Sequence, residues 1–139
     1  MSRVYWAGFF DGEGSIGVYK HRNNHIRLTV QIANTDLSVL ETLKEEFGGS
    51  IISRKPQPGC KPLYNWVIVS RMASIFLKTL YPYLRIKSEE AALALEAANI
   101  LHRRLHTTNN SRIKHPYPPR LFEIIVELKR LKNVARIAS

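Results

Sequence analysis

The glycines of a short apolar segment near the N-terminus constrain the fold more than any other feature of the sequence. Ser2 can cap a helix over residues 3–12. A glycine inside a helix costs about 1 kcal/mol relative to alanine, yet Gly8 and Gly12 lie four residues apart and so share one helix face. Gly12 and Gly14 alone would fit an ordinary helix end, but Gly8 lies inside the pattern. The bare face predicts close contact with a second helix.

Hydrophobic periodicity predicts two β-hairpins separated and followed by helices. The second strand alternates most cleanly, with Ile26, Leu28, Val30 and Ile32 on one face. The expected elements after the first helix are strands 15–21 and 25–33, a helix over 37–47 capped by Thr35 or Asp36, strands 50–55 and 64–69, a helix capped by Ser70 that reaches about Leu80, a helix over 89–105 capped by Ser88, and a last helix over 120–133.

This order of elements predicts an α+β fold with one antiparallel or mixed sheet and helices on one of its faces. The chain has 139 residues, which is the size of one domain. We therefore expect a single domain over residues 1–139, with a core over about 1–106 and a C-terminal loop and helix over 107–139.

The charge points to a polyanionic partner. The formal net charge is +10, and the excess lies entirely after residue 50, because residues 1–50 carry five Lys or Arg and six Asp or Glu. Nucleic acid is the first expectation and an anionic membrane surface the second.

No apolar run is long enough to span a bilayer. The single Cys60 excludes an intrachain disulfide and suits a reducing compartment. The sequence begins without a signal-peptide pattern, so we expect an intracellular protein.

The stretch Trp6–Gly14 resembles the signature helix of the LAGLIDADG homing endonucleases. Four of its positions match the motif letter for letter, namely Ala7, Gly8, Asp11 and Gly14. Its other positions carry permitted apolar, small or acidic residues. The predicted order also matches the α-β-β-α-β-β-α module of that family, with its saddle-shaped sheet, so the resemblance covers nearly the whole chain. It implies a site-specific DNA endonuclease that promotes the homing of an intron or other mobile element, cutting across the minor groove to leave short 3′ overhangs.

The resemblance also implies a metal site and a dimer. In the family the acid before the last motif glycine binds metal together with the preceding carbonyl, which here are Glu13 and Gly12. Phosphodiester hydrolysis needs an activated water and a stabilised leaving oxygen, which divalent metals supply, so we expect Mg²⁺, with two or three divalent ions per dimer site. One motif in one chain implies a homodimer on a pseudo-palindromic site. The expected interface residues are Ala7, Gly8, Asp11 and Gly12.

Two further catalytic residues follow from the resemblance. Lys87 takes the place of a basic pocket residue that stabilises charge or orients water; the alternative is a surface charge before a helix. Asn34 takes the place of a polar residue that orders water, or it belongs to an ordinary turn. Asp11 either bonds turn amides or binds metal directly. Ser38 stands where some relatives have a basic residue.

Alternation along the strands gives a candidate face for reading DNA in the major groove. Arg27 suits guanine and Gln31 suits adenine. Arg54 competes with Lys55 for this face in the second hairpin, and Trp66 is either on it or in the core. The full set of expected DNA-binding residues is Tyr19, His21, His25, Arg27, Thr29, Gln31, Ser53, Lys55 and, for phosphates in the late loop, Arg112 and Lys114.

The main alternative is a protein of the same fold without cleavage activity, which is either an RNA maturase that binds intron RNA or a DNA-binding regulator. Another alternative is a structural or membrane-surface protein that uses its basic helices. His102 and His106 have the spacing of a zinc pair on a helix, but no third ligand is evident. We expect double-stranded DNA as the partner, no membrane, and a location with the host genome in a bacterial or phage-infected cytoplasm or an organelle.

Overall fold

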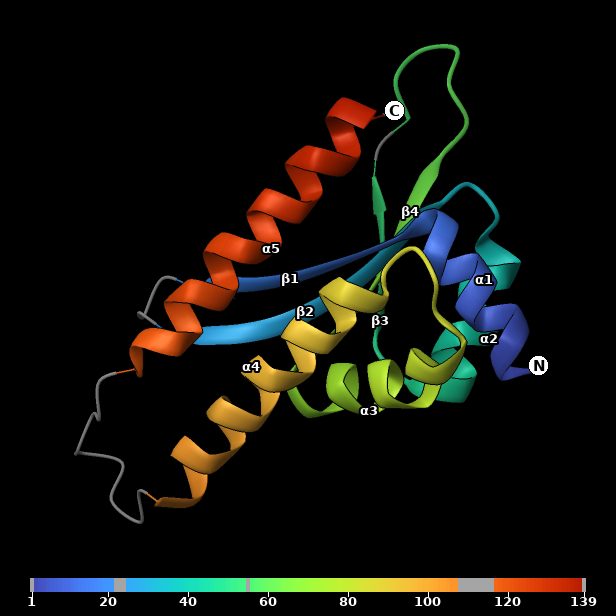
Figure 1. Cartoon of the computed structure of the whole chain (residues 1–139). Coiled ribbons are helices and arrows are strands. Elements are labelled where there is room, and N and C mark those ends of the chain that lie inside the picture. The colour runs from blue at the N-terminus through green and yellow to red at the C-terminus, as the bar shows by residue number, and fades with distance from the viewer. Residues whose placement is uncertain (1, 22–24, 55, 108–116, 139) are drawn as a thin grey trace.

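The computed structural model describes residues 2–21, 25–54, 56–107 and 117–138 (Figure 1). The predicted order of elements is confirmed, and the last helix begins one residue earlier and ends five residues later than predicted. The elements are α1 (Arg3–Glu13), β1 (Gly14–Lys20), β2 (Ile26–Asn34), α2 (Leu37–Phe47), β3 (Ser50–Arg54), β4 (Leu63–Val69), α3 (Ser70–Leu80), the short 3-10 helix η1 (Tyr81–Tyr83), α4 (Ser88–Thr107) and α5 (Pro119–Ala138).

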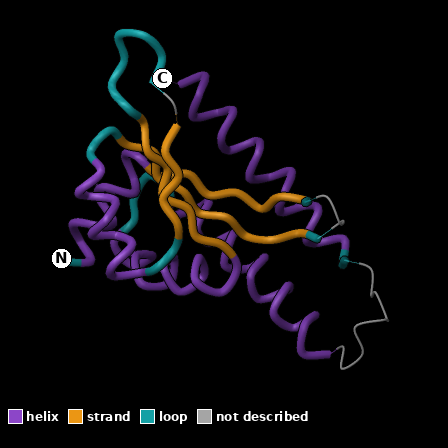
Figure 2. Tube along the Cα trace, turned by 180° about the vertical axis from the view of Figure 1, so that it is seen from behind, coloured by secondary structure: helices purple, strands orange, loops and turns teal. Residues whose placement is uncertain are grey.

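The described strands form one four-stranded sheet in the order β1-β2-β4-β3. Its strands are drawn in orange in Figure 2. Every pairing is antiparallel, so the sheet is antiparallel and not mixed. The central pairing joins β2 to β4, with Val30 opposite Ile68 and Ile32 opposite Trp66. The two hairpins therefore meet along strands that are separated in sequence by α2 and β3.

The core lies between one face of this sheet and the helices. Ile26, Leu28, Val30 and Ile32 are all buried, which confirms the predicted alternation of β2. Trp66 is fully buried and donates from Nε1 to the carbonyl oxygen of Gly48 at 2.9 Å, so it belongs to the core and not to the open face. Contacts from α1, α2, α3 and α4 cover this face of the sheet.

Two of the four predicted helix-capping residues are confirmed by the structure, and two are not. Ser2 accepts from the amide of Tyr5, and Asp36 accepts from the amides of Ser38 and Val39. The hydroxyl of Ser38 also donates to Asp36 at 2.6 Å, and this hydrogen bond together with those from the amides lowers the pKa of Asp36, since they favour its charged form. The predicted caps of the two later helices are wrong. Ser70 already lies inside α3, with φ 55° at a tight turn out of β4, and Ser88 is the first residue of α4, one residue after the true cap.

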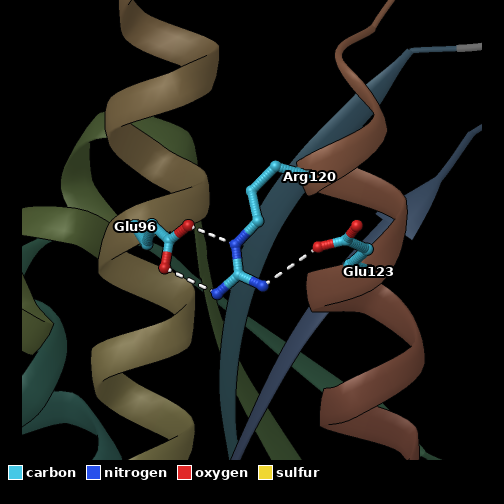
Figure 3. A network of polar contacts seen from close by, with 3 residues as sticks. All are labelled: Glu96, Arg120 and Glu123. Atoms are coloured by element: carbon cyan, nitrogen blue, oxygen red, sulfur yellow. Dashed lines mark hydrogen bonds and ion pairs between the residues drawn. The ribbon is translucent and has the colours of Figure 1, made fainter.

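The last helix, α5, packs against α4 and the edge strand β1 (Figure 1). Leu121, Ile124 and Leu128 are its buried side chains. On the outside, Arg120 binds Glu96 of α4 through two parallel hydrogen bonds of 2.5 and 2.9 Å and Glu123 through one of 3.2 Å (Figure 3). The guanidinium lowers the pKa of the Glu96 carboxyl. These groups are exposed, so we assign the docking of α5 mainly to its apolar side chains.

Among the residues that the structure describes, none of the helices is long and apolar enough to cross a membrane.

Candidate active site

The end of α1 and the start of α4 are joined by a reciprocal set of hydrogen bonds, which we call the Asp11–Lys87 clasp. The carboxylate of Asp11 accepts from the backbone amides of Arg85 at 2.9 Å and Lys87 at 3.0 Å. In return, Nζ of Lys87 donates to the backbone carbonyl oxygen of Asp11 at 2.7 Å. Asp11 is buried at 9% exposure. Of the two roles left open for Asp11, the structure therefore shows the bonding of turn amides.

Helix electrostatics explain the clasp. The last carbonyl groups of a helix lack intrahelical partners and carry partial negative charge. The last turn of α1 contains no basic residue, so the ammonium of Lys87 supplies the missing donor and charge. The clasp thereby fixes the Lys87 side chain at the C-terminal end of α1. The Lys87 side chain is half-buried and bonded rather than a free surface charge, and its catalytic role stays a prediction.

Glu13 is the last residue of α1 and is exposed. It follows Asp11 by two residues and so lies at the same corner of the fold as the Lys87 ammonium. Within the described part of the chain, its carboxylate has no hydrogen-bond or ion-pair partner. Glu13 and the carbonyl of the preceding Gly12 are hard oxygen donors of the kind that Mg²⁺ prefers, so the residues present fit a magnesium ion.

A single chain carries only part of such a site. No group of three or more His, Cys, Asp or Glu that could hold a metal is found among the residues described. A magnesium site can be completed by waters and substrate oxygens. Two metals flanking one phosphate need a second carboxylate, however. At the end of α1 the described chain offers only Glu13 as an exposed acid, because the carboxylate of Asp11 is held in the clasp.

The outer face of α1 is bare. Gly8 and Gly12 are exposed, and a Cβ atom placed on either glycine would meet no atom within 4 Å. The apolar side chains of Val4 and Tyr5 extend this face and are 63% and 45% exposed. No described residue of the same chain covers it, so the glycine face is available to a second helix.

Two of the predicted interface residues lie on the wrong side of α1. Ala7 is fully buried in the core, and the carboxylate of Asp11 points into the clasp. Because residues 7 and 11 lie four positions apart, they share a helix face, but it is the inward one. The exposed surface of α1 is instead the glycine face, which is formed by Val4, Tyr5, Gly8 and Gly12, and its role as a dimer interface stays a prediction.

The open face of the sheet carries the predicted reading residues. Tyr19 pairs with Arg27 and Ser15 with Gln31, and Thr29 pairs with Gly17. The loop ends His21 and His25 continue the same face, since the amide of His21 donates to the carbonyl of His25 at 2.8 Å. Gln31 accepts from Nδ2 of Asn65 at 3.0 Å. Sequence reasoning missed Asn65, although its alternation with the buried Trp66 was the signal that could have placed it.

In the second hairpin, the side chain that lies on the open face of the sheet is one residue away from the predicted one. Ile51 pairs with the buried Trp66, and Ser53 pairs with Tyr64 two residues further along. Side chains alternate along a strand, so Ser53 lies on the helix side of the sheet and Arg54 lies on the open face. The assignment of Ser53 to the reading face is wrong for this reason. Lys55, Arg112 and Lys114 lie outside the described residues.

Asn34, the last residue of β2, makes a turn bond. Its Oδ1 accepts from the backbone amide of Asp36 at 2.8 Å, just before α2 begins. Of the two roles that the sequence leaves open for Asn34, this bond shows the ordinary turn.

Comparison with known proteins identifies the family. Residues 6–92 match the model of the LAGLIDADG endonuclease family. The chain belongs to the LAGLIDADG endonuclease family. The curated protein "Probable intron-encoded endonuclease aI3" of Dictyostelium discoideum is 32% identical over 74 residues, which is 50% of this chain and 30% of that relative's length. The LAGLIDADG resemblance seen in the sequence is thus confirmed.

Solved structures of homing endonucleases share this fold. The archaeal intron-encoded homing endonuclease I-Vdi141I, complexed with DNA, has a TM-score of 0.70 and 24% identity over 93% of this chain and 82% of its own. The homing endonuclease I-TnaI has a TM-score of 0.63 and 21% identity over 100% and 99% of the two chains. The LAGLIDADG homing endonuclease I-GzeII, in complex with its DNA target, has a TM-score of 0.68 and 22% identity, over 93% of this chain but 44% of that one.

The LAGLIDADG match ends at residue 92, within α4. The α5 helix therefore lies beyond the matched residues, although it is joined to the module at several points. Nζ of Lys132 lies 3.3 Å from the hydroxyl of Tyr19 and 5.5 Å from the centre of its ring. The amide of Ile26 donates to the hydroxyl of Tyr117, just before α5, at 2.9 Å. The LAGLIDADG module of this chain is thus extended by α5 along its β1 edge.

Proposed function

We propose that this chain is a homodimeric, Mg²⁺-dependent, site-specific DNA endonuclease. The observation that carries the proposal is the position of Glu13, an exposed acid at the end of a bare glycine face and two residues after Asp11, whose carbonyl oxygen binds Lys87. Packing two glycine faces together brings two Glu13 side chains to one place. Membership of the LAGLIDADG endonuclease family supports the same conclusion.

Each residue at this corner has a proposed role. Glu13 and the carbonyl of Gly12 hold the divalent ions, which when bound activate water and stabilise the charge on the departing oxygen. Lys87 places a positive charge beside the scissile phosphate and stabilises negative charge that develops there. Asn34 remains a proposed water-ordering residue through the part of its amide that the turn bond does not use.

The open face of the sheet is the proposed DNA interface. Its strands offer alternate side chains to the major groove, including Arg27, Gln31 and Arg54. The formal net charge of +10 supplies the attraction to phosphates. A homodimer has two copies of this face related by two-fold symmetry, so the proposed target is long and pseudo-palindromic. Cleavage at such a site promotes homing of the mobile element that carries the gene.

The experiment uses duplex DNA in which the two sequences that flank this gene's insertion are joined. We expect the purified protein and Mg²⁺ to give a discrete double-strand break near the junction. Glu13→Gln should lose at least about a hundredfold in cutting rate while keeping its DNA affinity, because it loses an anionic metal ligand. Glu45→Gln, at an exposed position of α2, is the matched control and should cut normally.

Other outcomes separate this proposal from its rival. Normal cutting by Glu13→Gln would remove Glu13 from the catalytic role. Tight binding without cutting by the unmodified protein in Mg²⁺ would favour a regulator or maturase of the same fold, and intron RNA would then be the next ligand tested.

A further inference from the structure

His21 and Arg27 form a side-chain pair on the open face of the sheet. Nε of Arg27 donates to Nε2 of His21 at 3.0 Å. Arg27 lies on β2 opposite Tyr19 of β1, and His21 follows β1 by one residue and bonds the backbone of His25. The two side chains are therefore diagonal neighbours across an antiparallel pair, at a distance that long side chains can bridge.

The chemistry of the two groups fixes the state of the histidine. A guanidinium group has only donors and keeps its proton in proteins. Nε2 of His21 must therefore act as an acceptor, which requires the neutral imidazole with its proton on Nδ1. The pair consists of one cation and one neutral ring, so the charge of Arg27 remains available to a partner.

The hydrogen bond also selects which edge of Arg27 faces outward. An arginine can present either its Nε–Nη edge or its Nη1–Nη2 edge to a planar pair of acceptors. The imidazole occupies Nε, and within the described residues neither Nη atom of Arg27 has a hydrogen-bond partner. The terminal edge is thus the one left free, and it matches the O6 and N7 acceptors of guanine in the major groove.

We infer that His21 is a positioning residue for Arg27, and that the pair specifies one G·C base pair in each half of the DNA target. This inference rests on the proposed DNA-binding function. His21 holds the guanidinium plane before DNA arrives, so less side-chain freedom is lost when the two hydrogen bonds to guanine form. The imidazole acts through Arg27 and does not itself read the base.

The test is selection of binding sites from a pool of duplexes with a randomised central segment, in Ca²⁺ so that binding is measured without cutting. Arg27→Ala identifies the base pair that depends on Arg27, and we expect that pair to be G·C in the pool selected by the unmodified protein. His21→Ala should reduce the preference for guanine at that pair about tenfold, with other positions unchanged. His21→Gln, whose side-chain oxygen can accept from Nε, should restore most of the preference.

His102→Ala is the matched control, because it removes an exposed imidazole on α4, on an element that does not contribute to the open face. It should leave the preference at the Arg27 position as it is. In the double variant His21→Ala/Arg27→Ala, the selected sites should equal those of Arg27→Ala alone, because His21 acts through Arg27. Thermal unfolding of each variant shows whether a change in preference reflects a change in folding.

Two results would overturn the inference in distinguishable ways. An unchanged guanine preference in His21→Ala, or a base other than guanine at the Arg27 position, would overturn the positioning role while the proposed function stands. A pool that shows no enriched sequence for the unmodified protein would overturn the proposed site-specific function, and the inference with it.

Discussion

At the residue scale, the hydrogen bond from the Lys87 amide to Asp11 takes the place of a capping bond that Glu90 would otherwise make at the start of α4. The carbonyl of Lys87 accepts from the amide of Ala91, so Lys87 is the cap residue and Glu90 stands three residues later. A glutamate at that position commonly bonds the amide of the cap residue. Here Asp11 already occupies that amide. Glu90 is left half-buried without a hydrogen-bond partner in the described chain.

Burial raises the pKa of the Glu90 carboxyl, while the charges of Lys87 and Lys132 oppose the rise. A carboxyl with a raised pKa in the folded state is destabilising when ionised, and this cost disappears as the pH falls and the group takes up its proton. We therefore expect Glu90→Gln to unfold at a higher urea concentration than the unmodified protein near neutral pH.

The gain in Glu90→Gln should shrink as the pH is lowered through the titration range of the carboxyl. Urea unfolding followed by circular dichroism at several pH values measures it. Glu89→Gln removes a charge from the neighbouring exposed position and should show no such gain. A Glu90→Gln variant that is less stable than the unmodified protein at neutral pH would contradict the expectation.

At the element scale, α1 has two faces with opposite requirements. Its inward face packs Trp6, Ala7 and Phe10 into the core, and its outward face carries Gly8 and Gly12 with open space above them. A substitution of Gly8 thus meets no obstacle in the folded chain itself. The same side chain would keep two glycine faces from approaching closely.

Gly8→Leu should therefore separate folding from association. We expect the variant to be at least as stable as the unmodified chain, since glycine is a poor helix former, but to sediment as a monomer at micromolar concentration and to lose DNA cutting. Asn99→Leu, at an exposed position of α4, is the matched control and should associate normally. A Gly8→Leu protein that stays dimeric would refute the glycine face as the interface.

At the scale of the whole molecule, two-fold symmetry of the proposed dimer dictates the form of the target. Each protomer reads one half-site with the same open face, so the two half-sites are inverted repeats. A duplex made from one half of the natural target and its own inverted repeat should be cut at a rate comparable with the natural target. Gel analysis of the cleaved duplexes measures this. Cutting of a direct repeat in preference to the inverted one would contradict the symmetric arrangement.

The sequence predicted the features that depend on local pattern or on the motif. The alternation from Ile26 to Ile32 placed β2 correctly, and the resemblance of residues 6–14 led to the family. Ser53 was misplaced because β3 has five residues and no clear alternation, so only its pairing with β4 fixes its face. Ala7 was misplaced because glycine spacing gives the bare face of a helix but not the limits of that face.

Local sequence patterns could not predict contacts between residues that are far apart in the chain. The bond between Asp11 and the amide of Lys87 spans 76 positions, and the bond between Asn65 and Gln31 spans 34. No local propensity encodes such distances, because they follow from the pairing of β2 with β4 and the return of the chain to the end of α1. The resemblance to the family supplied a place for Lys87 but not its bonding partners.

The Asp11–Lys87 clasp makes assembly of the proposed active site depend on completion of the fold. The signature helix α1 is synthesised before both hairpins and α3, whereas Lys87 is made only after them. A nascent, truncated or partly unfolded chain can thus display Glu13 without the lysine fixed at the end of α1. For a protein proposed to cut its host's DNA, this arrangement limits cutting to completely folded molecules, because incomplete molecules lack the assembled proposed site.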